Sequence, residues 1–228
     1  MNTNQRSFSV VVPVYGCRDC LDSLCEQLDL QLAALTEKYE IILVDDRSPD
    51  NWWAILPALQ AKYRAVKGVR LSRNYGQQIA ITAGLGTAKG DYVVVMDCDL
   101  QDPPSLIPEL FAKLQEGCDL VLGRRVVRQH ALHRRFAAKA YAAISSWLTG
   151  SDVDGTQGAY SILSRKVVDA FLLFEEQERY YLSILRCLGF KVGTVDFSHH
   201  PRHSGNSSYR FRDLFHIGVN GILLQGTV

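Results

Sequence analysis

The chain has 228 residues, of which 47% are hydrophobic and 21% are charged. A chain of this length and composition buries enough apolar surface to fold as one domain, which excludes disordered, collagen-like and low-complexity proteins. The 25 basic and 24 acidic residues leave a formal net charge of +1. This near balance excludes recruitment of nucleic acid by a global positive field. We expect a single domain over residues 1–228.

The sequence predicts a cytoplasmic protein with reduced cysteines. No apolar stretch reaches the about 18 to 20 residues that span a bilayer, and residues 1–7 are polar, unlike a secretory signal. Cys17 and Cys20 form a CxxC pair, but no second pair follows at zinc spacing, so we assign this pair no metal. All six cysteines are expected as free thiols, mostly small core residues.

The first half of the chain predicts four strand-helix units in series. Residues 9–14 form a β-branched run typical of a strand, and residues 21–35 repeat leucine at helical spacing. The pair recurs over residues 40–44 and 51–63, 69–71 and 77–87, and 92–96 and 104–115. Such alternation favours an α/β fold with a mostly parallel central sheet flanked by helices.

The regular alternation fades after Leu122. Residues 131–149 carry apolar side chains every three or four positions, which predicts a helix. We further expect a strand at 158–163, helices at 165–174 and 179–188, a strand at 191–197 and an amphipathic helix at 208–224. No internal repeat or domain boundary is visible.

Acidic residues follow two of the predicted strands. Asp45 and Asp46 follow the strand 40–44, and Asp97 and Asp99 follow the strand 92–96, where strand alternation would point both side chains the same way. In an open parallel sheet, ligands bind outside the carboxyl ends of the strands. Clustered carboxylates need a cation, and Mg²⁺ or Mn²⁺ typically takes one or two carboxylates plus substrate phosphates. The pattern predicts a metal-diphosphate site.

A purely structural interpretation of these aspartates is also available. Aspartate is common in turns and as a helix cap, and Asp50 and Asp102, which precedes Pro103, carry the sequence signals of such caps. A lone pair of aspartates therefore does not establish a metal site. The choice between the two interpretations depends on the other motifs.

Taken together, the motifs resemble glycosyltransferase family 2, and within it enzymes similar to dolichol-phosphate mannosyltransferase and the bacterial polyprenyl-phosphate glycosyltransferases. The resemblance covers nearly the whole chain. Its landmarks are Val-Val-Pro-Val-Tyr at 11–15, Val-Asp-Asp-Arg-Ser-Pro-Asp at 44–50, Leu-Ser-Arg-Asn-Tyr-Gly at 71–76, Met-Asp-Cys-Asp-Leu-Gln-Asp-Pro-Pro at 96–104, Gly-Arg-Arg at 123–125 and Arg-His-Ser-Gly-Asn-Ser-Ser-Tyr at 202–209.

The resemblance implies the GT-A fold of nucleotide-diphospho-sugar transferases and a set of site residues. A nucleotide pocket is implied at Pro13, Tyr15 and Asp45, with Asp46 and Arg73 nearby. The metal and the donor diphosphate are implied at Asp97, Asp99 and Gln101, and the acceptor at Arg202, Ser207 and Ser208 within an acceptor segment 201–228. Asp97, Asp99, Arg125 and Arg202 are the expected catalytic residues.

A basic segment follows the predicted core strands. No acidic residue occurs between Asp119 and Asp152, whereas arginine and lysine recur there. Guanidinium groups match phosphate oxygens, so Arg125 is a candidate to stabilise the leaving diphosphate, with Arg124, Arg134 and Arg135 as alternatives. Aromatic residues beside this segment favour contact with anionic headgroups over a merely solvated helix face. We therefore expect a peripheral protein at the cytoplasmic face of the membrane.

One motif departs from the family pattern. Many relatives carry Gly-Asp-Phe-Arg, with an acid that could serve as the base, where this chain has Gly-Ala-Tyr-Ser at 158–161. A phosphate acceptor is already ionised near neutral pH and needs little deprotonation, whereas a sugar hydroxyl needs a general base. The absence of this acid is therefore compatible with a polyprenyl phosphate as the acceptor. If the acceptor is a lipid-linked saccharide, the candidate bases are Asp152, Asp154 and Glu178.

The sequence therefore predicts an inverting, Mg²⁺- or Mn²⁺-dependent transfer of a sugar from a UDP- or GDP-sugar to undecaprenyl or dolichyl phosphate. A sugar-1-phosphate nucleotidyltransferase would need a glycine-rich loop after the first strand, where only Gly16 occurs. A dinucleotide binder fails because Gly84, Gly86 and Gly90 precede a strand instead of following one. A non-catalytic nucleotide-sugar binding module and a homo-oligomer stay open. Nucleic acid is not an expected partner.

Overall fold

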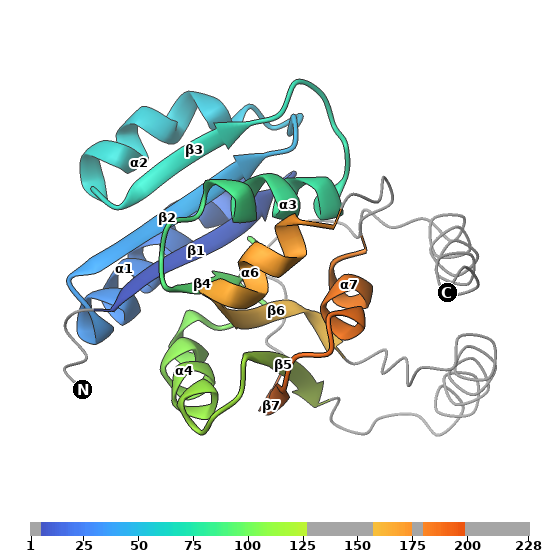
Figure 1. The fold of residues 1–228 in the computed structure, drawn as a ribbon. Coiled ribbons are helices and arrows are strands. Elements are labelled where there is room, and N and C mark those ends of the chain that lie inside the picture. Colours follow the sequence, from blue (N-terminus) through green and yellow to red (C-terminus); the bar gives the residue numbers. More distant parts are fainter. Residues whose placement is uncertain (1–5, 127–156, 175–179, 199–228) are drawn as a thin grey trace, which may run out of the picture.

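The computed structural model describes residues 6–126, 157–174 and 180–198 (Figure 1). Within them a seven-stranded sheet has the order β3-β2-β1-β4-β6-β5-β7. The strands are β1 (Ser7–Val14), β2 (Lys38–Asp45), β3 (Val66–Arg70), β4 (Tyr92–Val95), β5 (Leu120–Val126), β6 (Gln157–Ser164) and β7 (Val192–Ser198). The predicted helices at 131–149 and 208–224 lie outside the described residues.

Strand β1 is the centre of the parallel part of the sheet. Val11 pairs with Ile42 of β2 on one side and with Val95 of β4 on the other. Among the described strands only β6 runs antiparallel, between β4 and β5. The carboxyl ends of β1 to β5 and of β7 therefore share one edge of the sheet, and the start of β6 lies at the same edge.

Helices cover both faces of the sheet. The described elements between the strands are η2 (Arg18–Cys20), α1 (Leu21–Leu35), η3 (Trp52–Ile55), α2 (Leu56–Lys62), α3 (Gln77–Thr87), η4 (Pro104–Leu106), α4 (Ile107–Gln115), α6 (Arg165–Leu172) and α7 (Tyr181–Cys187). Side chains of α1, α2 and α4 pack with Val10 and Val12 of β1 on one face. Side chains of α3, α6 and α7 pack with Val11 on the other face (Figure 1). Strand alternation thus divides the core into two layers.

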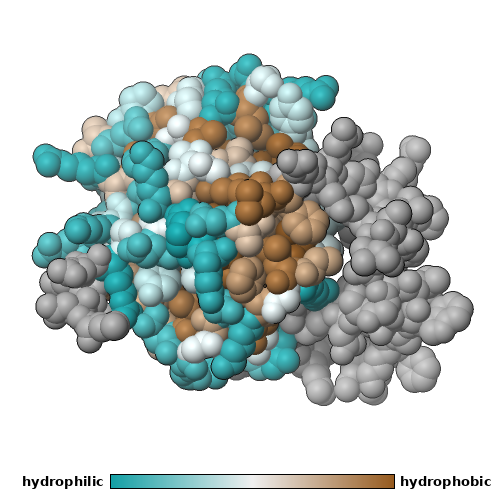
Figure 2. Space-filling model, viewed as in Figure 1, coloured by the Kyte–Doolittle hydropathy of each residue, from teal (hydrophilic) through white to brown (hydrophobic). Residues whose placement is uncertain are grey.

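The helices α3, α6 and α7 cover their face of the sheet incompletely, so some apolar side chains there stay exposed. Figure 2 shows apolar residues gathered on this side of the molecule. Leu172, Leu182 and Leu188 pack against the core while staying partly exposed, and Leu173 is 80% exposed. In the described part of the chain, no helix is both long and apolar enough to cross a bilayer.

The expected α/β order is confirmed, with differences at several boundaries. The helix predicted over 51–63 is split into η3 and α2, and the one predicted over 104–115 begins as η4. Strand β4 ends at Val95, one residue earlier than predicted. Strand β5 was not predicted, because its apolar half, Leu120–Leu122, is short and Gly123, Arg124 and Arg125 break the pattern. Four of the six free cysteines are buried, as expected.

Helix α3 lies unusually close to the sheet at Gly84. A Cβ atom added there would clash with Val11 Cγ1 and lie 3.1 Å from Val44 Cγ2, whereas a Cβ atom at Gly86 would have Leu172 Cδ2 at 3.9 Å as its nearest neighbour. The two glycines belong to the same helix, but only Gly84 is required for packing.

We therefore expect Gly84→Ala to lower the free energy of unfolding by about 1–2 kcal/mol, because overpacking outweighs the gain in helix propensity. Gly86→Ala, the matched control, should raise it by up to about 1 kcal/mol. Urea unfolding of both variants measures the difference. Equal effects of the two substitutions would contradict this account of how α3 packs.

Candidate active site

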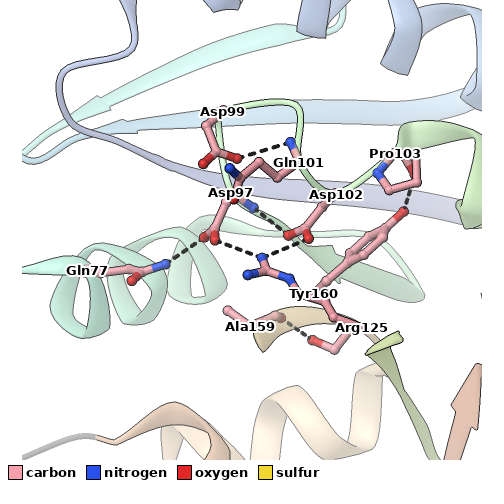
Figure 3. Close-up of polar contacts among 10 residues, drawn as sticks. Gln77, Asp97, Asp99, Gln101, Asp102, Pro103, Arg125, Ala159 and Tyr160 are labelled. Carbon is pink, nitrogen blue, oxygen red and sulfur yellow. Dashed lines mark hydrogen bonds and ion pairs between the residues drawn. The ribbon is translucent and has the colours of Figure 1, made fainter. Parts of the chain in front are cut away.

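The turn after β4 carries the aspartates predicted to bind metal. Asp97 is the second residue after β4, and Leu100 adopts a left-handed conformation with φ of 61°. The Asp99 Oδ1 atom accepts a hydrogen bond from the Gln101 amide at 3.1 Å. Asp99 thus lies in a turn and not on the strand, so the predicted strand alternation of Asp97 and Asp99 is wrong. Figure 3 shows both residues on this turn.

A partly buried ion pair joins this turn to β5. Arg125 Nη2 donates to Asp102 Oδ1 at 2.9 Å, and the same nitrogen lies 3.6 Å from Asp97 Oδ2. The Asp102 side chain is 0% exposed. Its Oδ2 atom accepts from the Asp97 amide at 3.5 Å. The expectation that Asp102 merely caps a helix is wrong, because Pro103 occupies the N-cap position of η4 and Asp102 faces Arg125.

The electrostatics of this pair follow from its burial. Burial alone would lower the pKa of Arg125, but Asp102 and Asp97 outweigh that effect, so the pKa lies above its usual value and the guanidinium stays charged. Burial raises the pKa of the Asp102 carboxyl, and Arg125 opposes this rise. The Arg125 guanidinium therefore acts on the carboxyl groups of both Asp102 and Asp97.

Helix α3 contributes a residue that the sequence analysis missed. Gln77, the first residue of α3, donates from Nε2 to Asp97 Oδ1 at 2.6 Å. The available signal was its position at the start of a helix that follows the Leu-Ser-Arg-Asn-Tyr-Gly motif, and so at the same edge of the sheet. Gln77 and Arg125 hold Asp97 from two sides (Figure 3).

Asp45, expected in the nucleotide pocket, is buried and bonded to several residues inside the protein. Its Oδ1 atom accepts from Trp52 Nε1 at 3.1 Å and from the Ser48 amide at 2.9 Å, and its Oδ2 atom pairs with Arg70 Nε at 2.9 Å. The side chain is 2% exposed. Asp45 therefore ties the loop after β2 to the end of β3. Asp50 accepts from the Trp52 amide at 3.3 Å, but Asn51 and not Asp50 occupies the N-cap position of η3, so the expected cap is wrong there too.

Asp46 binds the loop that leads into α3. Its two carboxyl oxygens accept from the amides of Tyr75 at 2.7 Å and of Gly76 at 2.8 Å. Burial raises the pKa of the Asp46 carboxyl, while these two amides lower it. Its own amide donates to the Val14 carbonyl at 3.3 Å, so the loops after β1, β2 and β3 are joined.

Two exposed tyrosines and an arginine lie on these loops. Tyr15 is 43% exposed and Tyr75 is 45% exposed, whereas Pro13 is buried. The Arg73 guanidinium lies 4.7 Å from the centre of the Tyr75 ring. A planar base finds here the kind of aromatic and cationic surface that supports stacking.

The expected basic residues divide between two roles. Arg124 forms a bidentate pair with Asp196 of β7, at 2.6 and 2.9 Å. The side chain of Arg125, the next residue, lies on the opposite face of β5 and points to the turn after β4. Arg134 and Arg135 lie outside the described residues, as do Arg202, Ser207 and Ser208.

The position of the absent acid is occupied by Ala159, which packs against the core layer of α3, α6 and α7. Ser161, on the same side of β6, shares a 2.7 Å hydrogen bond with the Tyr181 hydroxyl. No carboxylate therefore stands at this position. The alternative bases Asp152, Asp154 and Glu178 lie outside the described residues.

The donor set fits a hard divalent cation bound together with a substrate. Within the described ranges, no three His, Cys, Asp or Glu side chains form a ready cluster for a metal. Asp97 and Asp99 offer carboxylate oxygens from one turn, and Gln101 adds an amide oxygen. Mg²⁺ and Mn²⁺ accept such a sparse set, because phosphates and water complete their coordination.

Solved structures share this architecture. Glucosyl-3-phosphoglycerate synthase from Mycobacterium tuberculosis, crystallised with Mn²⁺, UDP and phosphoglyceric acid, aligns with a TM-score of 0.68 over 98% of this chain and 79% of that chain. The sequences are 18% identical, so the likeness concerns the fold. The expected GT-A fold is confirmed.

Sequence comparisons identify the family. The model of glycosyl transferase family 2 matches residues 9–172. An uncharacterized glycosyltransferase of Synechocystis is 34% identical over 94% of this chain and 68% of the relative. Undecaprenyl-phosphate 4-deoxy-4-formamido-L-arabinose transferase of Proteus mirabilis is 35% identical over 92% of this chain and 64% of the relative. The chain thus spans about two thirds of the length of these relatives, and it belongs to glycosyl transferase family 2.

Proposed function

We propose that this protein transfers a sugar, with inversion, from a UDP- or GDP-sugar to a polyprenyl phosphate. The observation that carries the proposal is the meeting of the turn 97–102 with Arg125 beside the loops that hold Asp45 and Asp46. A nucleotide and a charged diphosphate require adjacent sites of these two kinds. Relatives named for transfer to undecaprenyl phosphate support the acceptor class.

In this proposal the nucleotide lies against Pro13, Tyr15 and the Arg73–Tyr75 pair. Asp46 shapes that pocket by fixing the loop that carries Tyr75. Asp45 acts mainly from inside the protein, because its oxygens already accept from Trp52 and Ser48 and pair with Arg70. The sugar and the diphosphate then extend toward the turn after β4.

Asp97, Asp99 and Gln101 would hold Mg²⁺ or Mn²⁺ with the diphosphate of the donor. Once bound, the cation stabilises the negative charge that develops on the leaving oxygens. Gln77 orients Asp97 for this task through its 2.6 Å hydrogen bond. Arg125 lies next to the same carboxylate and pairs more closely with Asp102.

The reaction itself is a displacement at the anomeric carbon of the sugar. A phosphate oxygen of the acceptor forms the new bond, the bond to the donor diphosphate breaks, and the nucleoside diphosphate leaves. An ionised phosphate near neutral pH has no proton to lose at the attacking oxygen. Ala159, in place of the acid of many relatives, is compatible with such an acceptor, which Arg202, Ser207 and Ser208 would bind at the cytoplasmic membrane surface.

The decisive experiment incubates the protein with a panel of UDP- and GDP-sugars, Mg²⁺ or Mn²⁺, and undecaprenyl phosphate. We expect release of a nucleoside diphosphate together with formation of a glycolipid. Release of pyrophosphate from a nucleoside triphosphate and a sugar 1-phosphate would instead identify a nucleotidyltransferase. Donor binding without any turnover across the panel would identify a binding module.

In that assay Asp99→Ala should reduce turnover by at least about 100-fold, because the transition-state charge loses part of its stabilisation. Asp22→Ala is the matched control, since Asp22 forms an exposed ion pair with Lys62 of α2, outside the turn after β4, and such pairs contribute little. Unchanged turnover in Asp99→Ala, with the control also active, would remove the metal assignment.

Arg202→Ala should raise the KM for polyprenyl phosphate by about tenfold or more, because a charge-assisted hydrogen bond to phosphate is lost. The KM for the nucleotide-sugar should change less than twofold. Initial rates with each substrate varied in turn measure both constants. Equal increases of the two constants would contradict the placement of Arg202 at the acceptor.

A further inference from the structure

The Asp102–Arg125 pair joins parts of the sheet that are not neighbours. Asp102 belongs to the turn after β4 and Arg125 to β5, while β6 lies between these strands. The pair therefore crosses over the start of β6, at the edge where the candidate site lies. Neither partner was expected from sequence to contact the other.

Strand β6 is shaped to admit the arginine. A Cβ atom at Gly158 would lie 3.3 Å from both Cζ and Nη2 of Arg125, so a side chain there would crowd the guanidinium. Two residues further on, Tyr160 donates to the Pro103 carbonyl at 2.7 Å and anchors the end of the turn. Gly158 thus leaves room for the guanidinium, and Figure 3 shows Tyr160 reaching the Pro103 carbonyl.

Within this space Asp102 is the partner that fixes the guanidinium. The Arg125 Nε atom is buried and has no hydrogen-bond partner among the described residues. Nη2 donates to Asp102 at 2.9 Å and lies farther, at 3.6 Å, from Asp97. Asp102 also accepts from the Asp97 amide, so one carboxylate contacts both the arginine and the backbone of a candidate metal ligand.

We propose that Asp102 is a positioning residue that acts through Arg125: it compensates the arginine charge and holds the guanidinium beside Asp97. A divalent cation at Asp97 would then lie beside an arginine whose charge Asp102 already compensates. Without Asp102, the uncompensated guanidinium would pair with Asp97 and repel the cation. This inference rests on the proposed function, because it assigns Asp97 to a metal.

The test is a double-mutant cycle with Asp102→Asn, Arg125→Gln and the double variant. The primary measurement is Mn²⁺ affinity, by electron paramagnetic resonance with and without UDP. We expect Asp102→Asn to weaken Mn²⁺ binding by about tenfold, as is usual when support of a metal ligand is lost. In the Arg125→Gln background the same substitution should change the affinity less than about twofold, because the charge that Asp102 compensates is gone.

A kinetic measurement separates positioning from a loss of structure. In Asp102→Asn the Mn²⁺ concentration for half-maximal rate should rise about tenfold, in step with the affinity. Thermal unfolding of all variants shows whether each one is folded. Asp91→Asn is the matched control, since Asp91 also accepts a backbone amide hydrogen bond, from Ser7, at the opposite edge of the sheet; its Mn²⁺ affinity should equal that of the wild type.

Two results would overturn the inference. Equal weakening of Mn²⁺ binding by Asp102→Asn in both backgrounds would show that Asp102 acts on the turn directly and not through Arg125. Wild-type affinity in folded Asp102→Asn would show that it does not act on the metal at all. If wild-type protein binds Mn²⁺ but transfers no sugar, the proposed reaction fails while the cycle still decides the role of Asp102. If it binds no Mn²⁺, both proposals fail.

Discussion

The site depends on one constraint: each carboxylate buried at the carboxyl edge of the sheet needs a compensating donor, because an unpartnered charge away from water is costly. Asp45 finds Trp52, Ser48 and Arg70, and Asp46 finds the amides of the loop before α3. Asp102 finds Arg125. Since these partners come from β3, β5 and the loops after β2 and β3, satisfying the carboxylates also fixes how the loops lie together.

The same constraint distinguishes two groups of aspartates. Asp45, Asp46 and Asp102 are nearly or fully buried, so they organise the site from within. Asp97 is less buried, with a side chain 28% exposed, and it receives Gln77 on one oxygen and the more distant Arg125 near the other. Of these four carboxylates, Asp97 is therefore the one that solvent reaches, whereas the other three are enclosed by their partners.

Much of the fold followed from the pattern of apolar residues, because strands buried on both faces and leucine-rich helices have distinct periods. Strand β5 was not predicted, since half of it carries polar residues whose partners, such as Asp196 for Arg124, are far away in sequence. Asp102 was misjudged for a similar reason. Beside two prolines it has the local signals of a helix cap, and only the crossing of β5 near the turn supplies the arginine that it binds.

The sequence by itself determined the α/β order, the family resemblance and the acidic motifs after β2 and β4, because these features are local runs of residues. The tertiary structure decided which residues meet: Gln77 and Arg125 at Asp97, and Trp52 and Arg70 at Asp45. The reason is physical. Periodicity and composition fix what a segment becomes, whereas the partner of a buried charge depends on strand order and register, which bring together residues that are distant along the chain.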